Sequence, residues 1–173
     1  MAGSLIKLDE IIASNDASIT LGASNWDSSY DVYMVKYYNA VPGTDNQVFQ
    51  FRFTEGGTPN TSANYDYAAK VYTANTAYTT LVNQNDTFAR GLTYGNQTGE
   101  SGNGMLYLFN FNSTTEYAFC TLETTTFGSN AQNNGAMGGA VLTVTGTARD
   151  GIQFFFNTGN IASGTFTLYG LKK

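Results

Sequence analysis

The end of the chain, Gly151 to Lys173, contains two runs in which apolar and polar residues alternate. Large apolar residues occupy every second position: Ile152, Phe154 and Phe156 in the first run, and Phe166 and Leu168 in the second. A period of two is typical of a β-strand with one buried face. The small polar residues between the runs are typical of a turn. We therefore expect the chain to end in the closing strand pair of a β-sandwich.

The rest of the chain repeats this pattern of short alternating runs and turn residues. Its 173 residues suit one domain with a core of its own. The 12 Tyr, 12 Phe and 19 Gly, against only 2 Pro, favour strands joined by polar turns. We expect roughly nine short strands and no long helix. The predicted fold class is all-β, an antiparallel β-sandwich of the jelly-roll type.

We divide the chain into an N-terminal arm, residues 1–16, and a single β-sandwich domain, residues 17–173. The spacing of the arm's apolar residues fits a short strand or one turn of helix about equally well. These residues are Leu5, Ile6, Leu8, Ile11 and Ile12. The arm carries acidic residues early and lacks a long apolar run, so we do not expect a secretory signal. Because it is too hydrophobic for a free tail, we expect it to dock on another chain.

The residue types present leave little room for catalysis. The chain has no histidine, which excludes Ser-His-Asp and Cys-His catalysis and any imidazole metal site. Cys120 is the single cysteine, so no intramolecular disulfide can form, and we expect it to be a small buried apolar residue. A carboxylate pair, Asp27 with Asp31 or Glu116 with Glu123, remains possible for glycoside hydrolysis. Isolated surface acids are the simpler interpretation, so we expect no enzyme, metal or cofactor.

Charge and hydropathy exclude two further classes of partner. The formal net charge is −5, and the 8 Lys and Arg residues are scattered along the chain, so nucleic acid is not an expected partner. No apolar stretch approaches the roughly 20 residues of a membrane span, so membrane insertion is not expected either.

Aromatic residues among the polar loops are candidates for stacking on a sugar ring. The candidate glycan-facing residues are Trp26, Tyr30, Tyr65, Tyr67 and Tyr94. The alternative interpretation, which we favour, is that most of them pack inside the sandwich or at a subunit contact.

Several stretches over nearly the whole chain carry a resemblance to a known family. They are Leu5–Glu10, Ala17–Leu21, Ser29–Tyr33, Asn39–Asp45, Tyr65–Ala68, Leu106–Asn110 and Ser163–Gly170, with the ending GNIASGTFTLYGL the most specific. The chain resembles small structural proteins of tailed-phage virions, of decoration or fibre type, that are common in marine phages. The resemblance implies a virion component made in the cytoplasm of the host bacterium. It implies no catalytic residues.

The leading hypothesis is a capsid decoration protein, of cement or head-fibre type, that binds the shell and its major capsid protein. The arm would be its docking segment. A chain that starts directly on its β-domain would have no long shaft, which favours decoration over a complete fibre. The alternative is a tail-fibre or receptor-binding module that recognises host surface glycans. A glycan-cleaving enzyme is a third and weaker hypothesis.

We also expect a homo-oligomer, since several strands are apolar on both faces. The apolar surface of these strands is larger than one monomer would leave exposed to water. The residues that contribute it are Tyr33, Val35, Tyr37, Met105, Tyr107, Phe109 and Phe155. The expectation of a trimer rests on analogy with other virion jelly rolls.

Overall fold

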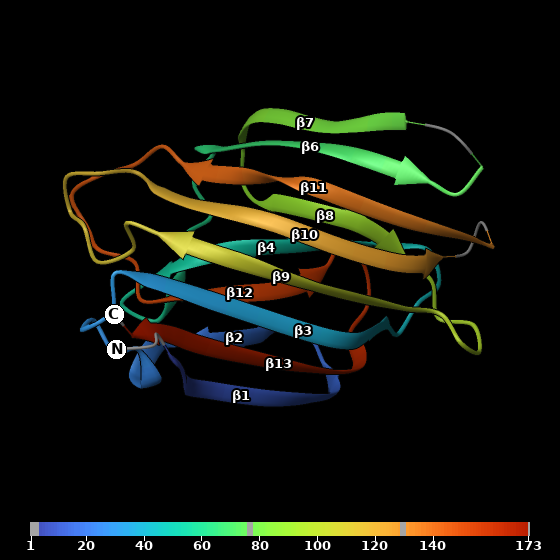
Figure 1. The fold of residues 1–173 in the computed structure, drawn as a ribbon, viewed down its shortest axis with the longest axis horizontal. Coiled ribbons are helices and arrows are strands. Elements are labelled where there is room, and N and C mark those ends of the chain that lie inside the picture. Colours follow the sequence, from blue (N-terminus) through green and yellow to red (C-terminus); the bar gives the residue numbers. More distant parts are fainter. Residues whose placement is uncertain (1–3, 76–77, 129–130, 173) are drawn as a thin grey trace.

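The computed structural model describes residues 4–75, 78–128 and 131–172. Within these ranges it contains thirteen strands, one 3₁₀ turn, η1 (Ala23–Asn25), and no α-helix (Figure 1). The strands are β1 (Ser4–Asp16), β2 (Ile19–Gly22), β3 (Val32–Pro42), β4 (Gln47–Glu55), β5 (Thr58–Pro59), β6 (Tyr65–Thr73), β7 (Tyr78–Asp86), β8 (Ala89–Tyr94), β9 (Ser101–Phe109), β10 (Ala118–Gly128), β11 (Gln132–Leu142), β12 (Gly151–Phe156) and β13 (Ile161–Lys172).

The strands form two sheets that stack face to face. The larger has eight strands in the order β1-β13-β3-β9-β10-β11-β6-β7, and it lies in front in Figure 1. The smaller has five strands, in the order β2-β12-β4-β5, with β8 also paired to β4. Neighbouring strands are antiparallel in both sheets. The expected all-β, antiparallel sandwich without a long helix is therefore confirmed for the described residues.

The strand count and the pairing at the end of the chain differ from the expectation. The structure has thirteen strands instead of roughly nine, because polar stretches such as β7 also form strands. β12 and β13 are not a pair: β12 lies between β2 and β4 in the smaller sheet, and β13 between β1 and β3 in the larger. Alternation predicts a strand and its buried side, but it does not predict the partner, which is set by contacts far along the sequence.

The arm expected over residues 1–16 is, in its described part, a strand of the sandwich. β1 pairs with β13 along its whole length, with one irregularity between Lys7 and Asp9. Ala13 is buried in the core, and Leu8 and Ile11 pack against the core. The edge strand therefore packs on the same hydrophobic core as the rest of the described sandwich.

Aromatic rings fill most of the space between the sheets. Phe49 of β4 stacks on Phe154 of β12, with ring centroids 5.4 Å apart and an interplanar angle of 8°. Tyr37 of β3 and Phe166 of β13 pack on the same cluster from the other sheet. Such pairs contribute beyond the burial of their area, so this cluster binds the two layers together. Cys120 is buried as expected, and burial raises the pKa of its thiol to about 12.

Three buried hydroxyls join both sheets inside this core. The Tyr37 hydroxyl lies 2.8 Å from that of Tyr94 and donates to Thr124 Oγ1 at 2.9 Å. Thr124 in turn donates to the carbonyl of Asn103. Because every hydroxyl has a partner, the polar atoms are buried without the penalty of a lost hydrogen bond.

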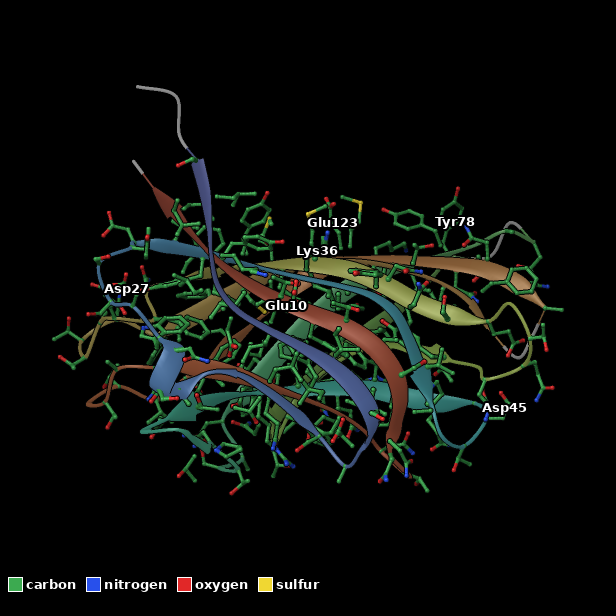
Figure 2. All side chains as sticks on the ribbon, turned by 90° about the horizontal axis from the view of Figure 1, so that it is seen from below. Glu10, Asp27, Lys36, Asp45, Tyr78 and Glu123 are labelled. Carbon is green, nitrogen blue, oxygen red and sulfur yellow. The ribbon has the colours of Figure 1, made fainter. Side chains whose placement is uncertain are left out.

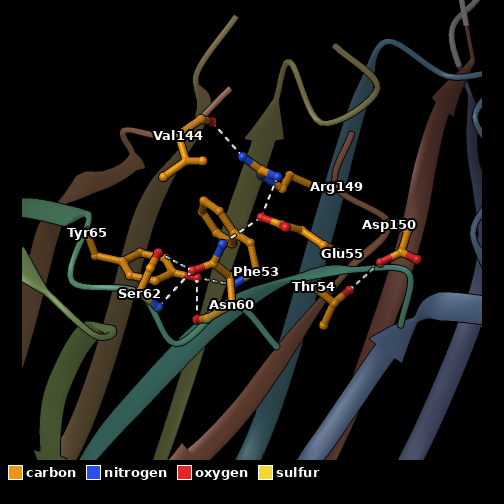
Figure 3. A network of polar contacts seen from close by, with 9 residues as sticks. All are labelled: Phe53, Thr54, Glu55, Asn60, Ser62, Tyr65, Val144, Arg149 and Asp150. Atoms are coloured by element: carbon orange, nitrogen blue, oxygen red, sulfur yellow. Dashed lines mark hydrogen bonds and ion pairs between the residues drawn. The ribbon is translucent and has the colours of Figure 1, made fainter. Parts of the chain in front are cut away.

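A second polar network ties two loops together at one end of the sandwich (Figure 3). The Arg149 side chain is buried, forms an ion pair with Glu55 and donates to the carbonyl of Val144. Glu55 also accepts a hydrogen bond from Asn60, at 2.6 Å. On the same loop, Asp150 accepts from the Thr54 hydroxyl and from a backbone amide. The connection from β11 to β12 is thereby fixed against the end of β4.

Candidate functional site

The most unusual surface of the molecule is the side of the eight-stranded sheet that points away from the five-stranded sheet. We call it the outer face. Of the large hydrophobic side chains exposed in the described residues, all but Ile6 and Tyr117 occupy outward positions of this sheet. They are Leu5, Ile12, Tyr38, Tyr72, Tyr78, Val82, Met105, Phe119, Phe127 and Met137. None belongs to a strand of the smaller sheet. Apolar patches of this extent mark interaction surfaces.

The strand registers place one residue from each strand in a line across this face. We call this line the central row; from β1 to β7 it contains Glu10, Thr167, Lys36, Met105, Glu123, Met137, Lys70 and Thr80. Glu123 and Lys36 point outward from the sheet in Figure 2, and Tyr78 lies on the same side. Met137 is 53% exposed and Met105 37%. From Lys36 to Lys70 the row thus alternates charged side chains with methionines, which are flexible and polarisable and adapt well to a partner.

The acids of the row differ in how far the chain neutralises them. Glu10 pairs with Lys7 at 3.2 Å and accepts from the Thr167 hydroxyl, and these hydrogen bonds lower the pKa of its carboxyl. Glu123, near the middle of the sheet, is exposed, and no hydrogen bond or ion pair of its carboxylate occurs with the described residues.

The two lysines of the row lie over aromatic rings. The Lys36 ammonium is 5.2 Å from the ring centroid of Tyr38, and that of Lys70 is 5.8 Å from the centroid of Tyr78. Lys36, Lys70 and Glu123 therefore present charge among the apolar side chains of this face.

Small residues next to the central row leave hollows in the outer face. The neighbouring row contains Lys7, Tyr169, Met34, Tyr107, Thr121, Gly139, Ala68 and Val82. Around Gly139 and Ala68 lies an open hollow of about 950 Å³, with Phe119 and Val82 at its sides. A second hollow, of about 670 Å³, lies between Lys36 and Glu123. The outer face therefore has hollows into which side chains of a partner could fit.

The predicted docking residues all belong to β1, but they divide between two environments. Leu5, Ile6 and Ile12 are exposed, whereas Leu8 and Ile11 are half-buried against the core. β1 is the last strand of its sheet, and in the described chain its far edge has no strand partner. An unpaired edge offers backbone N–H and C=O groups to another chain. Docking by this segment remains a prediction, and the exposed three are its candidate contacts.

The predicted glycan-facing residues do not form one site. Tyr65 and Tyr94 are fully buried and Tyr67 is 9% exposed, so the first two cannot face a ligand. Their hydroxyls find partners inside the fold, which is why these residues tolerate burial. Trp26 and Tyr30 are half-buried and pack on the ring of Tyr33. The interpretation that these aromatics serve packing is the better one for this set.

Two features of these regions lack a clear signal in the sequence. Asn112 holds the Trp26 loop: it accepts from the indole N–H at 3.0 Å and donates to the carbonyls of Tyr30 and Ser28. The 950 Å³ hollow is lined on its β7 side by three consecutive amide residues, Asn83, Gln84 and Asn85. The amide-rich composition of the chain is the only hint in the sequence, and it does not single out these positions.

The apolar residues that we expected at a subunit contact lie in three different environments. Met105, Tyr107 and Phe109 lie at outward positions of β9 on the outer face. Tyr33, Val35 and Tyr37 are buried in the core. Phe155 lies on the outer side of the smaller sheet, where the Arg52 guanidinium covers its ring at 4.5 Å. The outer face thus takes its apolar character from β9 and its neighbours, including Tyr38 of β3, and not from Tyr33, Val35 and Tyr37.

The candidate carboxylates Asp27, Asp31, Glu116 and Glu123 are all exposed. Hydrogen bonds from the backbone and side chain of Ser29 lower the pKa of Asp27, which is the opposite of what a general acid needs. Among residues 4–75, 78–128 and 131–172, no three His, Cys, Asp or Glu side chains gather as a metal site. In the same ranges, no helix has the length and apolarity to cross a membrane.

Comparison with protein-family models found no match to this chain, and no curated protein and no solved structure matched it either.

Proposed function

We propose that the protein is a structural component of a tailed-phage virion, a decoration protein that binds the capsid surface as a homo-oligomer. The observation that carries the assembly role is the outer face, where most of the exposed large apolar side chains of the described residues gather. The virion setting is supported by the resemblance of the stretches from Leu5–Glu10 to Ser163–Gly170. The proposed role requires surfaces for self-association and for the shell, and it requires no catalytic group.

The strand pairing supports a finer proposal for the fold, a jelly roll with an inserted wing. Four antiparallel pairs are nested by sequence: β1 with β13, β2 with β12, β3 with β9, and β4 with β8. Nested pairs shared between two sheets are the pattern of two Greek keys rolled together, which is common in viral capsid domains. β6, β7, β10 and β11 are then insertions that widen one sheet beyond β9.

Two adjoining surfaces, which share Leu5 and Ile12, would serve the two kinds of contact. The outer face would hold copies of the chain together, because it carries the large apolar area. The free edge of β1, with Leu5, Ile6 and Ile12, would dock on the major capsid protein. Since β1 belongs to the sandwich, the docking surface would be rigid rather than a flexible arm.

Copy number in purified particles of the parent phage tests the virion role. The proposal expects the chain in a number that follows the symmetry of the shell, measured by quantitative mass spectrometry. A number typical of the tail would contradict decoration, and absence from particles would contradict the virion role altogether.

The docking edge is tested by replacing Leu5, Ile6 and Ile12 with serine and measuring binding to undecorated particles. The oligomeric state of the variant is measured as well, because Leu5 and Ile12 also lie on the outer face. We expect a folded protein that no longer binds them. Tyr117→Ser is the matched control, because Tyr117 is similarly exposed but lies off β1. Full binding by the triple variant would show that β1 is not the anchor.

A host-glycan receptor module remains the second candidate, and the 950 Å³ hollow favours it. Amides of Asn83, Gln84 and Asn85 stand opposite the ring of Phe119 there. Amides that bond hydroxyls, beside a ring that stacks on a sugar, suit a glycan. A glycan array with wild type and Phe119→Ala distinguishes the two roles: binding that this variant loses would favour the receptor module.

A further inference from the structure

The charges of the central row have opposite signs at mirrored positions about β9. One strand to either side of Met105 lie Lys36 on β3 and Glu123 on β10. Three strands to either side lie Glu10 on β1 and Lys70 on β6. Each lysine thus has an acid at the same distance on the opposite side of β9. A surface whose charges invert about a line is complementary to a copy of itself.

We propose that a second copy of this chain packs on the outer face, related to the first by a two-fold axis along β9. Rotation by 180° about this axis leaves β9 over β9 and exchanges the strands on its two sides. β3 then lies over β10 of the second copy, and β1 lies over its β6. The inference deepens the proposed function and rests on it, since it takes the outer face to be the surface of self-association.

This arrangement places every charge of the central row opposite its complement. Lys36 faces Glu123 of the second copy, Glu10 faces Lys70, and symmetry repeats both pairs. Sheets stacked face to face lie about 10 Å apart, a gap that a lysine and a glutamate side chain together can span. Such a contact is isologous, so it closes as a dimer and does not propagate. It gives Glu123 the partner that the described chain lacks.

The other two-fold arrangement of the same faces is disfavoured. An axis laid across the strands, along the central row, would set each charged residue over its own copy. Lys36 would then face Lys36, and Glu123 would face Glu123. Like charges brought together in an interface are unfavourable, so the charges select the axis along β9.

The sizes of side chains in the neighbouring row agree with the same axis. Tyr169 of β13 lies two strands from β9 on one side, and Gly139 of β11 lies two strands from β9 on the other side. The rotation brings the tyrosine over the glycine, where the hollow beside Ala68 leaves room. Large side chains over small ones are what close packing of two faces requires.

The overlapping area is sufficient for a stable dimer. Seven strands, β1 to β6 in sheet order, overlap their mates, and β7 extends past the partner's edge. Strands about 4.8 Å apart, each contributing about nine residues at 3.3 Å, give about 1,000 Å² per copy. A standard stable interface buries about 800 Å² per partner. This two-fold dimer differs from the trimer expected by analogy with other virion jelly rolls.

Charge reversal on the full-length chain tests the axis. Lys36→Glu sets two acids against each other twice in the dimer, and Glu123→Lys does the same with two lysines. We expect each single variant to weaken dimerisation about 10- to 100-fold, measured by sedimentation equilibrium. The double variant Lys36→Glu/Glu123→Lys should recover to within about threefold of wild type, because both pairs are restored with inverted sign. Glu116→Lys, an exposed charge reversal off the face, is the control and should change nothing.

A mixture of wild type and the double variant sharpens the test. Each should form its own homodimer, but mixed dimers would juxtapose like charges, so native mass spectrometry should find almost none. A wild-type monomer or trimer overturns the two-fold contact, and so does a folded double variant that fails to recover. Thermal unfolding of each variant confirms that it is folded.

Binding to particles separates this inference from the proposed function. A monomeric wild type that still decorates particles would overturn the two-fold contact and leave the decoration role standing. A charge-rescued dimer that does not bind particles would support the contact and overturn decoration.

Discussion

Two glycines of β9 are required by tyrosine rings that cross the strand. A Cβ on Gly102 would lie 1.9 Å from a ring carbon of Tyr94, and a Cβ on Gly104 would lie 2.5 Å from the Tyr37 hydroxyl. In the sequence these glycines form a loose cluster before a strand, without a helix whose N-terminus could hold phosphate. Their role is steric: they make room for the buried hydroxyl network between the sheets.

Gly102→Ala should therefore destabilise the fold strongly. We expect a loss of about 3 kcal/mol in the free energy of unfolding, at the upper end of the overpacking range, because the ring is buried and cannot move aside. Urea unfolding measures this. The control is Gly135→Ala, where the nearest atom to a new Cβ lies 3.7 Å away, in ordinary contact. Equal stability of the two variants would contradict the steric role.

The buried acids of the core predict how stability depends on alkaline pH. Burial raises the pKa of Cys120 from 9.0 to about 12 and that of Tyr37 from 10.0 to about 12. The folded state keeps these protons after the unfolded state has lost them. Stability should therefore be unaffected by these groups below pH 9 and fall as pH rises from 9 to 12, by about 1.4 kcal/mol per pH unit for each group.

Two variants separate the contributions in denaturant titrations at each pH. Cys120→Ala should flatten the profile from pH 9 to 10. Tyr37→Phe should reduce the slope above pH 10 without abolishing it, because burial also raises the pKa of Cys120, Tyr65 and Tyr94. Neither variant should alter the slope below pH 9. If both leave the alkaline slope of wild type unchanged, the loss of stability has another source.

At the level of single residues, alternation predicts the buried side of a strand well. Phe49, Phe51 and Phe53 are buried as a set, as are Phe166 and Leu168. Tyrosine is harder, because its ring can be buried once its hydroxyl finds a partner. For Tyr94 that partner is Thr124, on a strand of the other sheet. Nothing near Tyr94 in the sequence indicates it, so its burial could not be predicted.

At the scale of elements, strands are predictable and their partners are not. The sequence predicts that the segments of β12 and β13 pair as a hairpin, since only a short polar turn separates them. They lie in opposite sheets because each fills a gap left by earlier strands, β12 between β2 and β4 and β13 between β1 and β3. The hydrophobic arm is interpreted from the sequence as a separate segment for the same reason. Its partner strand, β13, lies at the other end of the sequence, so nothing near the arm indicates the pairing.

The loop between β11 and β12 depends on one buried ion pair. The Arg149 side chain is 2% exposed, whereas that of Glu55 is 26% exposed. Glu55→Gln leaves a buried guanidinium without a counter-charge, so we expect a loss of about 3 kcal/mol in the free energy of unfolding. Arg149→Met leaves a carboxylate that water can still reach, so its cost should be smaller. Chemical denaturation decides the order, and a larger loss for Arg149→Met would contradict this account.

At the scale of the whole molecule, the two sheets present unlike surfaces. In the described residues, the smaller sheet covers its one large outward aromatic, Phe155, with Arg52. The outer face of the larger sheet instead leaves Met105, Met137 and several aromatics exposed. Apolar residues on both faces of a strand predicted such a surface in general. The residues that form this surface could not be predicted from the sequence. Phe119 and Met137 belong to the inserted strands β10 and β11, and only the strand pairing of the folded chain places them on the same face.

If the outer face holds two copies together, folding and association must be linked. The unfolding temperature of wild type should then rise with protein concentration, because mass action favours the folded dimer. For a chain of this size we expect about 1–3 °C for each tenfold increase in concentration, measured by scanning calorimetry. Met105→Glu would place two carboxylates against each other on the two-fold axis, so this variant should unfold at a concentration-independent temperature. The matched control is Ile6→Ser, which is 38% exposed against 37% for Met105 but points away from the outer face, and it should keep the concentration dependence of wild type. A wild-type unfolding temperature that does not change between low and high micromolar concentration would show that the exposed apolar face is stable without a second copy.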